Sequence, residues 1–390
     1  MTFSEPNSSR SSIAILTHTQ YKDNIPIYGP TDSVRDFLRK NFKGEVFYLQ
    51  HSLYLGDGSV LTCDYRGKSE VLYRYNFHRN WNNIARYIVD FVYTLKLLIN
   101  CRRVSLIIAT DPLNFLYGYI LKRIKGVKKI IFFTVDYGYR RFDNGFLNWA
   151  YYNLDRFAVK RANFLWNSSR KISQVRAEQG VEDERNIHIP NTPLFEDVKI
   201  KSLDEIEPYT LVMAFSNYKQ VDFKIIFDSL RPLADEFPRI KIKLIGRGNF
   251  QEPISKIVKD RKLLKYAEFL DTHTHRETLE ELSCCALGLE CNTQELYWNE
   301  FREPIKLREY IFFGLPIISK PGHALVKEIV EEKIGFIVNN SDEFIKATGA
   351  FLRDYNFYAK TRERVLQLAE RYNKEKILFA AFDKAGIALG

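Results

Sequence analysis

The sequence predicts an α/β protein made of two Rossmann-like domains, each with a doubly wound parallel sheet. Short, continuously apolar segments alternate with helical segments, and this alternation runs through the chain twice. Such apolar runs are typical of strands that are covered on both faces of a parallel sheet. The length of 390 residues also suits two domains. Because ligands of such sheets bind at the carboxyl ends of the strands, we expect the two domains to face each other across a cleft that holds the site.

The first series begins with the apolar segment SIAILT at residues 12–17 and closes near Ile189. It predicts strands at 12–17, 45–49, 104–109, 129–134 and 163–167, and helices at 32–41, 84–100, 114–125 and 144–160. The acidic, proline-flanked segment 193–208 predicts a linker. We therefore expect the N-terminal domain to occupy residues 1–200.

The second series restarts the alternation after this linker. It predicts strands at 210–215, 241–245, 267–270, 286–290, 317–318 and 335–338, and helices at 223–237, 276–284 and 306–313, before a helix-rich end. We expect a second domain over residues 201–365. A final helix over residues 366–390 is expected to pack back on the N-terminal domain.

The positive charge of the chain is concentrated in its first half. The formal net charge is +10; residues 1–200 contain 29 Lys and Arg against 19 Asp and Glu, whereas residues 201–390 contain 29 of each. Such an asymmetry predicts an anionic partner for the N-terminal domain, such as a membrane surface or a phosphorylated acceptor. No pattern of a nucleic-acid-binding module accompanies the charge, so we expect no nucleic acid as a partner.

The composition also indicates the compartment. No run of about 18 uncharged apolar residues occurs, and the first twelve residues contain no apolar segment of the signal-peptide kind. The five cysteines lack CxxC spacing, which predicts reduced thiols rather than a disulfide framework or a zinc site. We therefore expect a cytoplasmic protein without a bound metal.

The strongest motif covers residues 303–318, where EPIKLREY is followed by GLPII. Pro304 at the first turn of a helix fixes the backbone, while neighbouring N–H groups have no partner inside the helix. These groups, the helix dipole and the charge of Lys306 predict a diphosphate site at this helix start. Glu309 lies one turn further on, where its carboxylate can accept both hydroxyls of a ribose.

With this motif the chain resembles the retaining glycosyltransferases of the glycogen-synthase-like superfamily, glycosyltransferase group 1 or family 4, which have the GT-B fold. The resemblance implies sugar transfer from a nucleotide-sugar donor, with retention, to a cell-surface polysaccharide, glycolipid or lipid-linked acceptor. The donor is a co-substrate, so no cofactor is implied. Glu309 would bind the donor ribose, and Pro304, Ile305 and Lys306 the diphosphate. Glu303, which opens the motif, is expected to be catalytic.

The resemblance also assigns residues outside this motif. Lys219, in the segment KQVD, is similar to a family lysine that reaches the donor phosphates, although the arginine usually found shortly before it is missing. Asp136 falls where the family often places a histidine; it is expected either to contact the transferred sugar in catalysis or to cap a turn. The remaining expected positions are Gly246, Gly248 and Asp271 at the nucleobase, and Gly29 and Pro30 in a loop near the acceptor and the donor phosphates.

Two alternatives to a sugar transferase stay open. A nucleotide-sugar epimerase can share this fold, and a catalytically silent partner subunit would explain the missing histidine and arginine. Three basic or aromatic clusters, at 73–81, 122–129 and 140–141, predict that the N-terminal domain docks peripherally on the inner membrane face. His273 and His275 have no ligand framework around them, and we expect both to be solvated.

Overall fold

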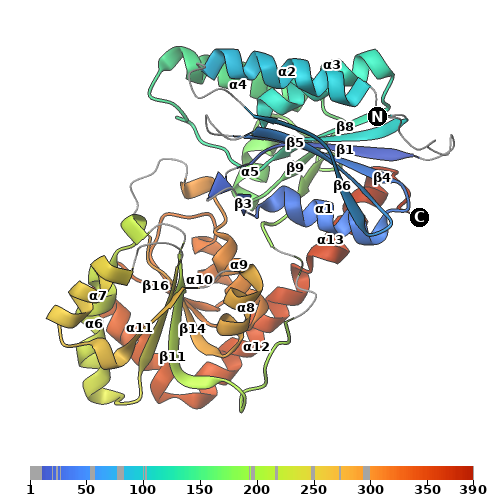
Figure 1. The fold of residues 1–390 in the computed structure, drawn as a ribbon. Helices are drawn as coiled ribbons and strands as arrows, with labels where there is room; N and C mark the ends of the chain where they lie inside the picture. Colours follow the sequence, from blue (N-terminus) through green and yellow to red (C-terminus); the bar gives the residue numbers. More distant parts are fainter. Residues whose placement is uncertain are drawn as a thin grey trace. The chain divides into compact units, whose positions relative to one another are not determined.

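The computed structural model describes residues 11–19, 21–22, 25–26, 28–52, 58–76, 83–99, 101, 103–192, 194, 198–215, 218–246, 251–271, 274–292 and 299–389. The chain forms two compact units (Figure 1). Unit 1 comprises Met1–Leu194 and Lys374–Gly390, and unit 2 comprises Phe195–Asn373. Among the described residues, no helix is long and apolar enough to span a membrane.

Unit 1 contains a sheet of eight strands in the order β10-β9-β8-β7-β1-β4-β5-β6. These strands are β1 (Ser12–Thr19), β4 (Glu45–Ser52), β5 (Gly58–Tyr65), β6 (Lys68–Asn76), β7 (Val104–Thr110), β8 (Lys129–Thr134), β9 (Phe164–Asn167) and β10 (Asn186–His188). A separate two-stranded sheet consists of β2 (Tyr21–Lys22) and β3 (Ile25–Pro26). The strand order reverses direction at β1, which pairs in parallel with both β4 and β7. The carboxyl ends of β1 and β7 therefore form the topological switch point of this sheet.

The hairpin β5–β6 is a part of unit 1 that the sequence analysis missed. It pairs antiparallel to β4 and makes the sheet mixed rather than wholly parallel. Arg66 and Gly67 form its two-residue turn with φ values of 50° and 76°. Two left-handed residues in succession match the twist of a hairpin, so the Arg-Gly pair between alternating segments was the available signal.

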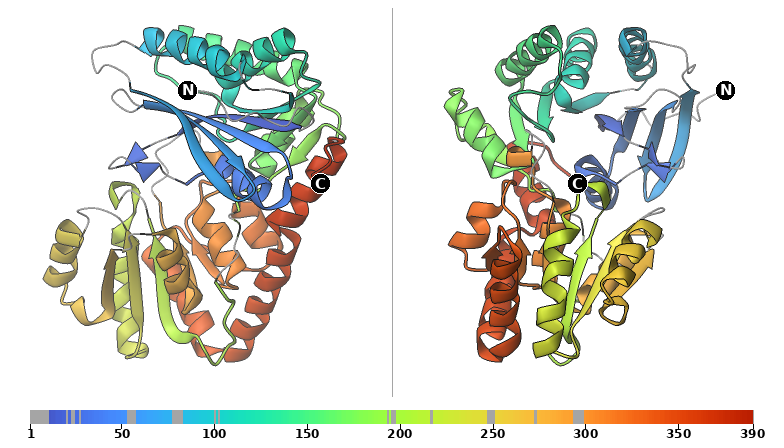
Figure 2. Two further views of the ribbon diagram at one scale, coloured as in Figure 1. Left: turned by 45° about the vertical axis from the view of Figure 1, so that its right-hand side comes forward. Right: turned by 90° about the vertical axis from the view of Figure 1, so that its left-hand side faces the viewer.

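The helices of unit 1 cover both faces of its sheet (Figure 2). The helices α2 (Asn83–Ile99), α3 (Asp111–Lys125) and α4 (Gly145–Arg161) contribute to the core on one face. The helices α1 (Pro30–Asn41) and α13 (Lys374–Lys384) contribute to the core on the other. α13 lies beside α1, where the ring of Phe382 stacks on that of Phe37 and also meets Trp166 edge-on. A further helix, α5 (Arg170–Glu178), lies between β9 and β10 in the chain.

Unit 2 contains a wholly parallel sheet in the order β13-β12-β11-β14-β15-β16. Its strands are β11 (Glu207–Ala214), β12 (Lys241–Gly246), β13 (Ala267–Asp271), β14 (Cys285–Glu290), β15 (Ile317–Ser319) and β16 (Gly335–Ile337). In chain order this is the sequence 3-2-1-4-5-6 of a Rossmann sheet, with its switch point between β11 and β14.

Helices flank the unit 2 sheet on both faces as well (Figure 1). One face carries α6 (Phe223–Glu236), α7 (Gln251–Asp260) and α11 (Ser341–Arg353). The other carries α8 (His275–Ser283), α9 (Ile305–Phe312) and α10 (Val326–Glu331), with α12 (Tyr355–Arg371) packed on α9. The unit boundary falls after α12, so residues 366–371, which we expected in the final helix, continue α12 in unit 2.

A tyrosine hydroxyl joins the two strands at the switch point of unit 2. The Tyr310 hydroxyl accepts a hydrogen bond from the backbone N–H of Ala214 at 3.0 Å and donates to the carbonyl of Leu289 at 3.2 Å. The hydroxyl thereby provides hydrogen-bond partners for one backbone N–H at the end of β11 and one backbone carbonyl near the end of β14. Gly288 allows this approach, because a Cβ at that position would lie 2.5 Å from the Tyr310 ring. The aromatic residue of the motif thus fixes α9 against the sheet.

Gly288→Ala is expected to destabilise the protein. The added methyl group must displace the buried ring of Tyr310, and overpacking of this kind costs about 1–3 kcal/mol. Urea unfolding followed by circular dichroism measures the loss. Gly349→Ala is the control in the same unit: its Cβ would meet only the end of the flexible Arg353 side chain, and we expect a change within about 1 kcal/mol. Equal stability of the two variants would contradict the close packing of α9 on β14.

Candidate functional site

The start of α9 lies at the carboxyl edge of the unit 2 sheet, because the helix follows β14 in the chain. Pro304 is the N-cap residue and offers no side-chain acceptor to the first turn. The first turn begins at Ile305 and receives no side-chain cap from residue 304, while the N–H of Leu307 donates to the carbonyl of Pro304 at 3.1 Å. Lys306 is half-buried within this turn and adds its positive charge. The local backbone and charge together favour an anion such as a phosphate.

Glu309 lies on the same helix, one turn after Ile305, and its side chain is only 4% exposed. Its Oε1 lies 2.7 Å from Nε2 of His275, the first residue of α8. The contact with His275 uses one lone pair of Oε1 and fixes the orientation of the Glu309 carboxylate. Since a carboxylate has about four acceptor positions, Oε2 and the remaining lone pair of Oε1 can accept two further hydroxyl donors.

The expectation that His275 is solvated therefore holds only for part of its ring. Its ring is 35% exposed and hydrogen-bonds to Glu309 across 34 residues of sequence. Thr274 and Glu277 form a capping box at the start of α8 and fix the backbone from which the ring projects. The capping-box pattern was visible in the sequence, but the contact with α9 depends on tertiary packing. His273 lies outside the described residues.

Glu290, the last residue of β14, adds a buried carboxyl group at the same edge. Burial raises its pKa, while the charges of Lys306 and Arg302 oppose that rise. Asn292 donates a hydrogen bond to its Oε1. The charge of Lys306 therefore acts on this buried acidic group at the end of β14 as well as on the start of α9.

Lys219 also lies near this edge. It belongs to the short 3₁₀ helix η1 (Tyr218–Gln220), which follows β11, and its side chain is exposed. Asp222, three residues further on, contacts the segments that follow two neighbouring strands. Its N–H donates to the carbonyl of Cys291 at 2.7 Å, and its Oδ2 lies 2.5 Å from Lys320 Nζ. The loop that carries Lys219 is thus attached to the ends of β14 and β15.

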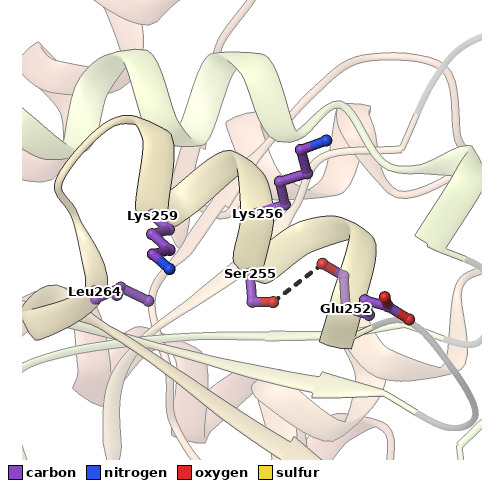
Figure 3. A pocket seen from close by; sticks show the side chains of 5 residues that line it. All are labelled: Glu252, Ser255, Lys256, Lys259 and Leu264. Carbon is purple, nitrogen blue, oxygen red and sulfur yellow. Dashed lines mark hydrogen bonds between the residues drawn. The ribbon is translucent and has the colours of Figure 1, made fainter.

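The expected nucleobase positions are only partly described. Gly246 ends β12 and pairs in register with Asp271, which ends β13, so both backbones reach the carboxyl edge. The side chain of Asp271 and the whole of Gly248 lie outside the described residues. A surface pocket lined by Glu252, Ser255, Lys256, Lys259 and Leu264 runs along α7 and includes none of the α9 residues (Figure 3).

Glu303 is engaged in the anchoring of α9. Its carboxylate accepts hydrogen bonds from Nε and Nη2 of Arg308 at 3.0 and 2.9 Å, and both side chains are 1% exposed. Arg308 also donates to Glu328 on α10 at 2.7 Å. These contacts give Glu303 a positioning role beneath the helix, and its expected role in catalysis stays a prediction.

The expected residues of unit 1 lie at the carboxyl edge of its own sheet. Gly29 caps α1 and Pro30 is its first residue; the N–H of Gly29 donates to Asp32 Oδ2 at 2.8 Å. A carboxylate therefore already lies at this helix start. Asp136 is exposed two residues after β8. Burial lowers the pKa of Arg141, but Tyr151, Asp136 and Asp111 raise it above its ordinary value, which places these groups around the guanidinium.

Metal ligation finds no support in the described part of the chain. No group of three or more His, Cys, Asp or Glu side chains that could hold a metal ion occurs there. The five cysteines are free thiols. The chemistry available at the unit 2 edge is thus that of Lys306, Glu309, His275, Lys219 and the first turn of α9.

Comparison with known proteins supports this architecture. No family model matches the chain. A curated relative, an uncharacterized glycosyltransferase of Haemophilus influenzae, is 24% identical over 192 residues, which is 48% of this chain and 51% of the relative. The chain therefore matches only about half the length of that relative.

The solved structures that resemble the chain match almost its whole length. The Anabaena protein HepE, solved with UDP and glucose, has a TM-score of 0.63 at 13% identity and covers 95% of this chain and 99% of its own. Sucrose-phosphate synthase from Thermosynechococcus elongatus has a TM-score of 0.61 at 13% identity, with 96% and 98% covered. WaaG, a glycosyltransferase of lipopolysaccharide biosynthesis, has a TM-score of 0.59 at 14% identity, with 95% and 98% covered. The chain thus has the two-domain fold of GT-B glycosyltransferases, which confirms the predicted fold class.

Proposed function

We propose that the chain transfers a sugar from a nucleotide-sugar donor, with retention, to a cell-surface saccharide or lipid-linked acceptor. The observation that carries the proposal is the pairing of Lys306 and Glu309 on one helix at the carboxyl edge of a 3-2-1-4-5-6 sheet. The donor diphosphate binds the first turn of α9 and Lys306, and the ribose hydroxyls bind Glu309, which His275 holds in place. Lys219 neutralises further phosphate charge. No metal is required in this arrangement.

A screen of donors tests the proposal. The full chain is mixed with UDP-, GDP-, ADP- and dTDP-sugars, and the unfolding temperature is recorded; a true donor raises it because it binds the native state. UDP-glucose comes first, since HepE was solved with UDP-glucose. Transfer to an acceptor is then followed by mass spectrometry and the anomeric configuration by NMR. Conversion of the donor sugar without acceptor would indicate an epimerase, and binding without turnover a silent subunit.

We further propose that unit 1 docks peripherally on an anionic membrane where it meets a lipid-linked acceptor. The support is an exposed patch at the start of α4, here called the α4 aromatic surface: Tyr139, Phe142, Phe146, Leu147 and Trp149. Phe146 and Trp149 are 70% and 62% exposed, and their rings stack at 5.7 Å. Arg140 and Arg141 lie within this patch in sequence. Aromatic rings beside basic groups favour the boundary between water and anionic lipid.

The other two basic clusters contribute less to such a surface. The ammonium of Lys122 donates to Asn163 Oδ1 at 2.9 Å, and those of Lys125 and Lys129 donate to the carbonyls of Cys101 and Ala385. These lysines are thus engaged in the packing of unit 1. Part of the cluster at 73–81, from residue 77 onward, lies outside the described residues.

The double variant Phe146→Ser/Trp149→Ser is expected to reduce binding to vesicles that contain anionic lipid by at least about tenfold, since two exposed rings lose their contact with the interface. Liposome flotation measures the bound fraction. Tyr355→Ser on α12 is the matched control, because that ring is 64% exposed in unit 2 and should not alter binding. Equal flotation of the double variant and the unchanged protein would end the proposal for this surface.

A further inference from the structure

A buried carboxyl group closes β14, the strand on one side of the switch point of unit 2. Glu290 is the last residue of this strand, which reads CALGLE, and it is only 4% exposed. Its backbone is fixed to β15, because its carbonyl accepts the N–H of Lys320 at 2.8 Å and the hydroxyl of Ser319 at 3.3 Å. The sequence analysis assigned no role to this residue.

The alternation of side chains along β14 places Glu290 on the face that α9 covers. Successive side chains of a strand point to opposite faces, so Gly288 and Glu290 share one face. On that face a Cβ at Gly288 would lie 2.5 Å from the ring of Tyr310. Glu290 is two residues nearer the carboxyl edge, and Lys306 is about one turn nearer the start of α9 than Tyr310. The Glu290 side chain therefore faces the first turn of α9.

The two oxygens of the Glu290 carboxyl have different surroundings. Nδ2 of Asn292 donates a hydrogen bond to Oε1, whereas Oε2 has no hydrogen-bond partner among the residues that the structure describes. A neutral carboxyl group has one oxygen that accepts and one hydroxyl that donates. Since Oε1 accepts from the amide, the proton of the neutral acid belongs on Oε2.

The charged groups around Glu290 are the cations that also face the start of α9. Burial raises the pKa of Glu290, and the charges of Lys306 and Arg302 oppose this rise. The other titratable groups that face it are the Cys291 thiol and the Tyr310 hydroxyl, and burial raises the pKa of both, so they stay neutral. An anion bound to Lys306 and Arg302 would offset their effect on Glu290. The pKa of Glu290 would then rise further.

The second buried carboxyl group of this edge is held in another way. Oε1 of Glu309 lies 2.7 Å from Nε2 of His275, and in the proposed site the Glu309 carboxylate accepts the ribose hydroxyls. Glu290 has a neutral amide as its partner instead. The two carboxyl groups are therefore suited to different tasks, one as an ionised acceptor and the other as a neutral donor.

An ionised Glu290 would work against an anionic ligand at Lys306. Two negative charges in one buried site disfavour each other, which lowers the affinity for the ligand and raises the pKa of the carboxyl. The neutral acid removes this repulsion and adds a hydrogen bond to a charged acceptor, which is a strong class of hydrogen bond. Protonation of Glu290 and binding of a diphosphate therefore favour each other, and this coupling is reciprocal.

We propose that Glu290 takes up a proton when the donor diphosphate binds at the start of α9, and that the neutral carboxyl then donates a hydrogen bond from Oε2 to a diphosphate oxygen. The inference rests on the proposed function. One proton moves from solvent to Oε2 as the donor binds, and it returns to solvent when the nucleoside diphosphate leaves.

The direction of the pH dependence follows from this coupling. The bound state has the higher pKa for Glu290, so donor affinity is constant below the pKa of the free protein. Affinity falls as the pH rises through the window between the two pKa values, and it is constant again above the pKa of the bound state. The total loss of affinity is about tenfold for each pH unit by which the diphosphate raises the pKa.

Calorimetry of the full chain with UDP-glucose between about pH 5 and 8 tests the proposal. Unlike UDP, UDP-glucose has no second phosphate ionisation, so the charge of the ligand stays constant over this range. The dissociation constant should rise with pH as described. Titrations at one pH in PIPES and in Bis-Tris, which differ in ionisation enthalpy, should show uptake of a fraction of a proton on binding.

Glu290→Gln keeps an oxygen that can accept from Asn292 and an N–H donor for the phosphate, but it does not titrate in this range. Its affinity should equal that of the unchanged protein at the low end of the range and exceed it at the high end, by about tenfold for each pH unit of the window. Its proton uptake should be smaller. Glu280→Gln, which removes an exposed carboxyl from α8, should keep the pH dependence and the uptake. His275 is present in all three proteins, so its ionisation cancels in the comparison.

Undiminished proton uptake and pH dependence in Glu290→Gln would overturn the proposal. So would weaker binding by Glu290→Gln at every pH, since an ionised Glu290 would then be required. If UDP-glucose does not bind, the proposed donor fails separately, and ¹³C NMR of the unchanged protein still decides the role of Glu290. Its carboxyl signal, assigned by triple-resonance correlations, is titrated with and without inorganic pyrophosphate. A pKa that pyrophosphate does not raise would overturn the proposal.

Discussion

Glu309→Ala is expected to weaken UDP binding to the full chain by about 10²–10⁴-fold. The variant loses two hydrogen bonds from ribose hydroxyls to a charged acceptor, and each such bond contributes about 1.5–3 kcal/mol. The carboxylate is 4% exposed, so water replaces it poorly. Isothermal titration calorimetry with UDP measures the dissociation constant, and the transfer rate should fall with it.

Variants of two residues on α8 serve as comparisons for Glu309→Ala. Glu280→Ala removes the same charge from an exposed pair with Arg276 on α8 and should leave UDP affinity unchanged. His275→Ala should cost only about tenfold or less, because the carboxylate remains and only its orientation is released. If the UDP affinity of Glu309→Ala stayed within twofold of that of the unchanged protein, the ribose would not bind to Glu309. The proposed donor site at α9 would then be wrong.

Much of the fold followed from the sequence because parallel strands buried on both faces are continuously apolar. The segment at 129–134 is both the predicted strand and the observed β8, and the helix predicted at 84–100 is α2 within one residue. The helices α5, α7 and α10 were missed. Each is short, with six to ten residues, and an apolar period is weak over so few turns.

The candidate site could be predicted from the sequence only where its residues lie on the same helix. Lys306 and Glu309 lie on α9, so their spacing on one helix was readable from the chain. His275 and Glu309 meet from two helices and are 34 residues apart in the chain. His18 near the end of β1 and Asp111, the first residue of α3, are also hydrogen-bonded and are 93 residues apart. Contacts of that kind depend on strand order, which the alternation of segments does not encode. Two of the structure's most informative hydrogen bonds therefore appeared only once the sheets were assembled.

The arginine between Lys306 and Glu309 in the motif serves stability rather than the donor. Arg308 donates to Glu303 and Glu328, its guanidinium stacks 3.9 Å from the ring centre of Tyr372, and the Tyr372 hydroxyl donates to Glu328 at 2.8 Å. Burial lowers the pKa of Arg308, but the charges of Glu303 and Glu328 raise it above its ordinary value. This cluster links α9 to α10 and to the end of α12.

Arg308→Met is expected to destabilise the protein by about 3–5 kcal/mol at pH 7, because two carboxylates remain buried without their counter-charge. Urea unfolding measures the loss. Arg371→Met is the control: its pair with Glu332 is 55% and 30% exposed, and its loss should cost no more than about 1 kcal/mol. Adding Glu303→Gln and Glu328→Gln to Arg308→Met should recover part of the stability. Equal costs for Arg308→Met and Arg371→Met would mean that the buried cluster does not anchor the helix, and the placement of Lys306 and Glu309 would then need another support.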